Sequence, residues 1–362
     1  MRNNVQRSFV FLLALLFAAT FATAEAGTQK ETIRMTIGGG HPSNTMAYTQ
    51  MAQMFFQPEI AKRVAERTNY QVEWVEGYGG TIAKITEGLL ACQDGILDIL
   101  VNTYSMDNRK LFLMNMPFYI PFCSPDPILA TKAIRKVYED FRPVYDEVWA
   151  TYNQKFLAFG QPGGYELVTN FPVDKMTDLA GHKIAAAGAN LPWLEGSGAI
   201  PVQSNLNEAY TCFQTGVYDG WIMFADPTYR FKLHEVAKNY TLIGFGSIAI
   251  QGISINIDTW NSLPPEVQAI VLEVSAEYEI KAAQEAKDWD DKAIEFMKNE
   301  GVRVTTLAAD ERAKWVNGLP DIPQVSSKEA EEMGYPGVQI WNAFMNAEKE
   351  LGYVFPREWV VK

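Results

Sequence analysis

The chain of 362 residues carries 31 basic and 43 acidic side chains, a formal net charge of -12, with 48% hydrophobic and 20% charged residues. At roughly 150 residues per domain the length suggests about two domains, and the ordinary globular composition excludes a disulfide miniprotein and a disordered chain. The acidic excess, and the lack of any segment that clusters Lys and Arg, exclude a nucleic-acid-binding protein.

The first 24 residues have the pattern of a cleaved secretory signal. Arg2 and Arg7 make a basic start, residues 9–19 are an unbroken apolar run, and small residues at 22–24 have the spacing of a cleavage site. The apolar run is too short to span a bilayer, so a retained membrane anchor is the weaker alternative. We therefore predict a signal peptide at 1–24 and a soluble, exported mature protein.

Three cysteines, Cys92, Cys123 and Cys212, lie in the mature chain. An exported protein is free to pair two of them, and the odd number leaves one thiol over. Their separations match no metal-binding motif, so we favour buried apolar thiols and leave open whether any two are bridged.

The first half of the mature chain alternates strand and helix patterns. In chain order we expect a strand at 31–37 that ends in three glycines, a helix at 45–67 that is kinked or broken at Pro58, a strand at 70–75, a helix at 81–92 and a short apolar strand at 97–101. This βαβαβ order predicts an α/β fold with a parallel sheet.

One short fragment occurs twice in the sequence. Residues 93–98 (QDGILD) and 214–219 (QTGVYD) each place a Gly where a helix C-cap needs a left-handed residue, and an Asp where the next strand opens. Two lobes built on one plan explain the repeat, and chance similarity of a common helix-to-strand junction is the alternative.

A long helical pattern organises the second half. No Gly or Pro interrupts the chain between Pro265 and Gly301, and a helix of that length would be roughly 55 Å long. Because this exceeds the diameter of one lobe, we predict a single helix that runs across both lobes. After it we expect a strand at 302–306 and helices at 308–317 and 326–351.

A search for catalytic motifs finds none at a recognisable spacing. His234 and Glu235 begin like a zinc-protease helix, but Lys238 stands where the second histidine would be. The glycines at 244 and 246 lead into an expected strand at 248–258, whereas a dinucleotide-binding loop leads into a helix. We predict a protein that is not an enzyme and uses no cofactor or metal, although the many carboxylates leave an acid and base pair open.

Aromatic and amide side chains gather at the ends of the expected strands, together with His41, which follows the first glycine turn. The carboxyl ends of strands are where α/β sheets bind ligands, and such side chains suit gripping a small molecule. Packing in the core or between the lobes is the alternative for each of them. The set comprises Tyr78, Asn102, Tyr104, Gln161, Tyr165, Trp193, Trp221, Phe224 and Gln251.

Several sequence blocks, spread over nearly the whole mature chain, resemble one family. The blocks are the glycine pair at 79–80, the 95–98 junction, MPFY at 116–119, DLAGHKI at 178–184, GAIPV at 198–202, EAY at 208–210 and GVYDG at 216–220. Together they resemble the DctP-type extracytoplasmic solute receptors of tripartite ATP-independent periplasmic (TRAP) transporters.

The resemblance implies an α/β, two-lobe periplasmic-binding-protein fold of type II-like architecture, with crossing strands and a long lobe-spanning helix. It implies lobe I at 25–160 plus 250–290 and lobe II at 161–249 plus 291–362. The function it implies is a periplasmic receptor that captures a small organic solute, by default a carboxylate, and delivers it to the small and large membrane subunits of a TRAP permease. We expect a monomer. The receptor of another importer, or a sensor, is the alternative.

The sequence departs from the family pattern at the ligand anchor. Most members have an Arg that pairs with a ligand carboxylate where this chain has Ala185, followed by two further alanines. A second Arg of some members falls near Tyr165, and a ligand-facing Asn falls at Met223. Loss of the Arg fork should greatly weaken binding of an ordinary carboxylate unless another cation replaces it.

Two hypotheses about the ligand follow. A carboxylate is still bound, with Lys84 or His41 supplying the charge; or the ligand is neutral, zwitterionic or an amine, held by aromatic rings with Asp226 as a counter-charge. The complete expected binding set is His41, Lys84, Asn102, Tyr104, Tyr165, Asn190, Trp221, Met223, Phe224, Asp226 and Gln251.

Overall fold

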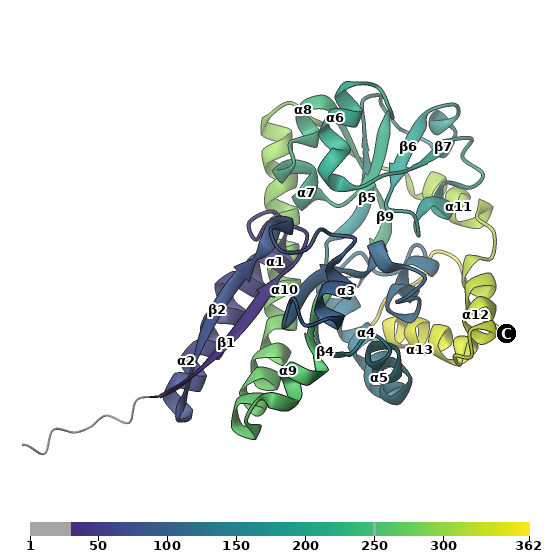
Figure 1. Ribbon diagram of the computed structural model, residues 1–362. Coiled ribbons are helices and arrows are strands. Elements are labelled where there is room, and N and C mark those ends of the chain that lie inside the picture. Colours follow the sequence, from purple (N-terminus) through teal and green to yellow (C-terminus); the bar gives the residue numbers. More distant parts are fainter. Residues whose placement is uncertain (1–29, 249–250) are drawn as a thin grey trace, which may run out of the picture.

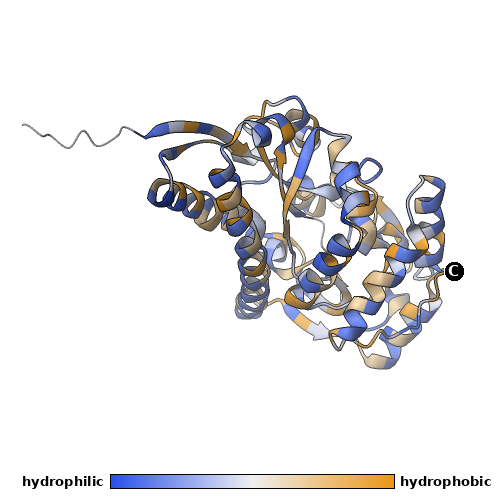
Figure 2. Ribbon diagram, turned by 90° about the horizontal axis from the view of Figure 1, so that it is seen from below, coloured by the Kyte–Doolittle hydropathy of each residue, from blue (hydrophilic) through white to orange (hydrophobic). Residues whose placement is uncertain are grey.

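The computed structural model describes residues 30–248 and 251–362, so the predicted signal peptide lies outside the described residues. Two β-sheets form the centres of two lobes, and helices cover their faces (Figure 1). The helices carry both hydrophilic and hydrophobic residues, as expected for helices that pack on a sheet with one side and face water with the other (Figure 2). No helix within the described residues is both long and apolar enough to cross a membrane.

The first sheet has the strand order β2-β1-β3-β10-β4. Strand β1 runs parallel to β2 and β3, whereas β10 runs antiparallel to β3 and β4. The strands are β1 (Glu31–Gly38), β2 (Tyr70–Gly77), β3 (Ile99–Thr103), β4 (Gln154–Gly160) and β10 (Gln251–Asn256). The predicted parallel βαβαβ unit is therefore confirmed.

The second sheet has the strand order β11-β9-β5-β8-β6-β7. Strands β6, β7 and β8 are parallel neighbours, and β5 runs antiparallel to β8 and β9. The strands are β5 (Gly164–Thr169), β6 (Lys183–Ala186), β7 (Ile200–Gln203), β8 (Gly220–Met223), β9 (Asn239–Ser247) and β11 (Arg303–Thr306).

The chain passes between the two sheets as consecutive strands, from β4 to β5 and from β9 to β10. The long helix α10 (Pro265–Asn299) runs beside both lobes and contacts β4 of the first sheet and β11 of the second (Figure 1). The predicted lobe-spanning helix is confirmed, with bounds within one residue of those expected.

The remaining helices surround the sheets. They are α1 (Ala47–Met51), α2 (Gln57–Arg67), α3 (Gly88–Gln93), α4 (Pro127–Asp140), α5 (Arg142–Ala150), α6 (Ala209–Gln214), α7 (Ala225–Arg230), α8 (Leu233–Val236), α9 (Ile257–Ser262), α11 (Ala309–Gly318), α12 (Ile322–Glu332) and α13 (Gly337–Glu350). Helix α13 packs against α4.

Two of three helix predictions need correction. The helix at 45–67, expected to be kinked or broken at Pro58, has a π-helical turn at 52–56 directly before that residue, between α1 and α2. Only residues 88–93 of the expected helix at 81–92 are helical; residues 84–87 form a turn in which the Glu87 carboxylate accepts a hydrogen bond from the Lys84 amide. The helix at 326–351 is two helices, separated at Gly334 with a φ of 90°.

The repeated fragment has the same structure in both lobes. Gly95 and Gly216 each have a φ of 72° and end a helix. Asp98 accepts a hydrogen bond from the Thr36 amide of β1 at 2.7 Å, and Asp219 accepts one from the Lys183 amide of β6 at 3.1 Å. Because each Asp ties the neighbouring parallel strand to its own, the two lobes share one construction plan.

The division into lobes stays a prediction at its exact boundaries. All strands of the first sheet fall within 25–160 and 250–290, and all strands of the second within 161–249 and 291–362. Helices α12 and α13, which the prediction places in lobe II, contact elements between residues 113 and 140 of the first lobe.

The three cysteines are unpaired, and Cys92 and Cys123 are buried. Burial raises the pKa of both thiols. The expectation of apolar thiols is therefore confirmed for these two, while Cys212 is partly exposed.

Candidate functional site

A cavity of about 470 Å³, counting the part that opens to solvent, lies between the two lobes. Its lining comes from both sheets, and most of it follows the carboxyl ends of parallel strands: His41 after β1, Ser105 after β3, Ala187 after β6, Ser204 after β7. Tyr165 and Gln251 stand at the starts of β5 and β10, and these strands run antiparallel to their neighbours. Strand starts and strand ends therefore meet at one edge, where α/β sheets bind ligands.

One part of the cavity lining consists of aromatic, thioether and aliphatic side chains, and the other part consists of neutral polar side chains. The apolar group is Met46, Ile85, Met106, Tyr165, Ala187, Leu206, Trp221, Met223 and Phe224. The polar group is His41, Thr103, Ser105, Ser204, Asn205, Asn207 and Gln251.

Six of the eleven predicted binding residues line this cavity, namely His41, Tyr165, Trp221, Met223, Phe224 and Gln251. The rings of Tyr165 and Phe224 meet edge to face, with their centroids 5.3 Å apart. Trp221 is 1% exposed, and its indole Nε1 has no hydrogen-bond partner within the described part of the chain. A buried donor without a partner is costly, so this N–H is a natural contact for an acceptor atom of a ligand.

The other five predicted residues lie elsewhere. Lys84 is exposed, in the turn before α3. Asn102, Tyr104 and Asn190 are buried behind the lining, Tyr104 with its ring edge-on to Trp149 at 5.4 Å. Asp226 lines a smaller adjoining cavity that shares Met46, Phe224 and Gln251 with the first.

Three further aromatic and amide residues from the strand-end set donate hydrogen bonds within the protein. Tyr78 donates to Gln57, Gln161 to Ser247 and Trp193 to the Phe118 carbonyl. Since these donors are occupied and the side chains do not line the cavity, we assign them to packing and positioning.

The sequence analysis missed the polar segment 204–207 and the methionines at 46 and 106. The segment follows β7, so the strand-end rule that selected His41 also applies to it. The methionines carried no comparable pattern, because their place in the lining depends on how the two lobes meet.

His41 is 4% exposed, and its Nδ1 lies 2.7 Å from the Tyr48 hydroxyl. Burial lowers the pKa of His41 from its usual value to about 4. The imidazole is therefore neutral at pH 7 and does not supply the positive charge that one ligand hypothesis required.

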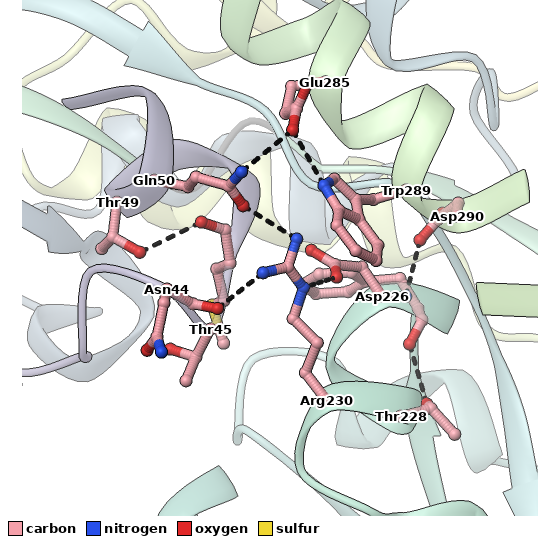
Figure 3. Close-up of polar contacts among 12 residues, drawn as sticks. Asn44, Thr45, Thr49, Gln50, Asp226, Thr228, Arg230, Glu285, Trp289 and Asp290 are labelled. Atoms are coloured by element: carbon pink, nitrogen blue, oxygen red, sulfur yellow. Dashed lines mark hydrogen bonds and ion pairs between the residues drawn. The ribbon is translucent and has the colours of Figure 1, made fainter. Parts of the chain in front are cut away.

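Beside the cavity, Arg230 of α7 forms a bridge between the lobes (Figure 3). Its Nε donates to Asp226 at 2.5 Å, its Nη1 to the Asn44 carbonyl at 2.5 Å and its Nη2 to Gln50 at 2.9 Å. Its guanidinium carbon lies 3.7 Å from the centre of the Trp289 ring on α10. Asn44 and Gln50 belong to the first lobe and Arg230 to the second, so these contacts hold the lobes together.

Burial raises the pKa of Asp226 to about 6, and the Arg230 guanidinium opposes that rise. The negative charge of Asp226 is therefore balanced by Arg230 within the bridge. No group of three or more His, Cys, Asp or Glu residues suited to a metal ion occurs in the described ranges.

Two α/β lobes joined by crossing strands, with a cavity between them lined from both, define a solute-binding protein. The chain belongs to family 7 of the bacterial extracellular solute-binding proteins, the DctP family, whose model matches residues 42–327.

Curated relatives match over part of their length. A solute-binding protein of Sulfitobacter is 34% identical over 137 residues, which are 37% of this chain and 41% of the relative. The C4-dicarboxylate-binding periplasmic protein DctP of Rhodobacter capsulatus is 29% identical over 46% of this chain and 50% of its own. The chain thus matches about half the length of these relatives or less.

Solved structures match over most of the fold. A TRAP solute-binding protein of Rhodoferax ferrireducens, in complex with copurified benzoate, has a TM-score of 0.77 at 14% identity and covers 88% of this chain and 98% of its own. A Bordetella pertussis extracytoplasmic solute receptor binding pyroglutamic acid has a TM-score of 0.73 at 20% identity, over 86% and 99%. At these identities the likeness establishes the shared two-lobe fold.

Proposed function

We propose that this protein captures a small organic solute in the periplasm and hands it, chemically unchanged, to the small and large membrane subunits of a TRAP permease. The observation that carries the proposal is the cavity lined from both lobes. A ligand that contacts both lobes binds the closed form better than the open one, so binding shifts the population toward closure. The permease would then recognise the closed form.

The family and the relatives support this function over an enzymatic one. The imidazole of the lining, His41, has its Nδ1 2.7 Å from the hydroxyl of the buried Tyr48, so this ring nitrogen is engaged within the protein. A cavity between two lobes that is lined by neutral side chains can bind a small molecule without converting it chemically.

Uptake into vesicles tests the proposal. Vesicles that contain a TRAP permease of the source organism should accumulate the captured solute under an ion gradient only when this protein is added. The solute recovered from the vesicles should have an unchanged mass. A changed mass would indicate an enzyme. Tight binding with no uptake would indicate the receptor of another importer or a sensor.

A further inference from the structure

The lining of the cavity carries no formal charge. Among the described residues that form it there is no Arg, Lys, Asp or Glu, and the single titratable base, His41, is neutral at pH 7. The mature protein is acidic overall, so its long-range field does not favour an anion either. The charges that a ligand could meet are therefore those of groups beside the cavity.

The charged groups beside the cavity are committed or directed elsewhere. Arg230 gives its three nitrogens to Asp226, Asn44 and Gln50 and stacks on Trp289. Its side chain is 13% exposed, so little of it remains open to a further partner. Asp226 accepts the Arg230 hydrogen bond at its Oδ1, and its Oδ2 has no hydrogen-bond partner within the described residues. It lines the smaller adjoining cavity, outside this lining, and its charge is balanced by Arg230.

Lys84, which one ligand hypothesis expected to supply a positive charge, is exposed and lies outside the cavity lining. Its backbone amide donates to Glu87, which fixes the turn that carries it. Its neighbour Ile85 reaches the cavity instead. The lining at this turn is therefore aliphatic.

The second lobe has small and aromatic side chains where the family anchor stands. Ala185 is buried in β6 between Val202 of β7 and Trp221 of β8. Ala187 lines the cavity two residues further on, at the end of the strand. Neither Ala185 nor Ala187 has a charged group that could contact a ligand.

Neutral hydrogen-bonding groups take the place of charges. The Trp221 Nε1 is a buried donor without a partner within the described residues. Gln251 contributes an amide from the first lobe, and Asn205 and Asn207 contribute amides from the second. Such groups pair with carbonyl, amide and hydroxyl groups at no charge penalty, whereas an unpaired buried charge is strongly disfavoured.

We infer that the ligand is an uncharged molecule, with a flat apolar part between Trp221, Tyr165 and Phe224 and a neutral carbonyl, amide or hydroxyl group that accepts a hydrogen bond. This inference rests on the proposed function and narrows it. It differs from the carboxylate that is the default of the family, and from the pyroglutamic acid and benzoate of the two solved structures described above.

Fractionated extract tests the inference. A bacterial culture extract is separated on ion exchangers at pH 7.5 into anionic, cationic and unretained fractions. The protein is incubated with each fraction and desalted, and released solutes are identified by mass spectrometry. We expect retention from the unretained fraction, with at least about a hundredfold preference over the anionic one. Preferential retention from the anionic or cationic fraction, or of a zwitterion from the unretained fraction, would overturn the inference and leave solute capture intact. Retention from no fraction would contradict the proposed function as well.

A charge-adding variant provides the matched control. Ala187→Arg places a guanidinium at the cavity, and Ala187→Gln adds comparable bulk without charge. We expect Ala187→Arg to move retention toward the anionic fraction, and we expect benzoate to raise the melting temperature of this variant, while Ala187→Gln gains no retention of anions. If the unmodified protein retains anions and Ala187→Arg does not increase their retention, a cationic site already exists and the inference is wrong. If Ala187→Arg does not fold, the unmodified protein and Ala187→Gln still decide the outcome.

Discussion

Replacing Arg230 by Gln should destabilise the protein and loosen the contact between its lobes. The change removes a guanidinium that joins Asp226, Asn44 and Gln50 and covers the Trp289 ring (Figure 3). Glutamine keeps a polar group but cannot reach all these partners or carry the charge.

The magnitude follows from burial. The side chains of Arg230 and Asp226 are 13% and 3% exposed, so the substitution leaves a buried carboxylate without its partner. Removing one partner of a buried ion pair costs about 3–5 kcal/mol of unfolding free energy. The pKa of Asp226 is about 6 with Arg230 present and should rise further without it.

The pKa of Asp226 determines how the loss of unfolding free energy in Arg230→Gln depends on pH. A raised folded-state pKa means that stability is greatest below the usual carboxyl pKa and declines as the pH rises through the folded value. Without Arg230 the decline continues to higher pH. The difference between the two proteins should therefore be larger at pH 7.5 than at pH 5.

Urea unfolding at both pH values measures the loss, and small-angle X-ray scattering of the free protein measures the separation of the lobes. The matched control is Arg230→Gln combined with Asp226→Asn, which removes the buried charge and should recover most of the stability. The radius of gyration should increase in Arg230→Gln. A loss below about 1 kcal/mol, or one that Asp226→Asn does not relieve, would refute the bridge as a buried ion pair.

Three further outcomes are expected. Burial raises the pKa of Glu348 to about 8, so this carboxyl should contribute a fall in stability of up to about 1.4 kcal/mol per pH unit between pH 4.5 and 8, and Glu348→Gln should lose less stability over that range than the unmodified protein in melting curves. Gly252→Ala would place its Cβ 2.3 Å from the Ala158 carbonyl oxygen, so urea unfolding should show a loss of about 1–3 kcal/mol; an unchanged midpoint would contradict this packing. Trp221→Phe keeps an aromatic ring but removes the unpaired Nε1, and calorimetry should show roughly tenfold weaker solute binding; equal affinity would remove this N–H from the site.

Features that depend on local chemistry could be predicted from the sequence. The long helix follows from an uninterrupted run between Pro265 and Gly301, since nothing in that run can break a helix. The shared plan of the lobes follows from Gly95 and Gly216, whose left-handed backbone a glycine adopts without strain.

Features that depend on a competing side chain could not be predicted in the same way. Residues 84–87 form a turn ahead of α3 in which the Lys84 amide donates to Glu87, and no periodicity reveals that hydrogen bond. By contrast, the division of the C-terminal helix at Gly334 could have been predicted, because Gly334 and the nearby Pro336 are residues that end helices.

The candidate site was predictable to the extent that strand ends define it. Trp221 and Gln251 were found because they stand at strand termini, which the fold brings to one edge. Asp226 was assigned to the ligand because its partner is visible only as an i,i+4 spacing to Arg230, which marks a helical ion pair as readily as a site.

The most direct test is a crystal structure of the protein with the solute it retains from the extract. We predict electron density for one small molecule between the lobes, in contact with Trp221 of the second lobe and Gln251 of the first. Density at another place, or a closed protein with this cavity filled only by water, would contradict the claim that the cavity is the capture site.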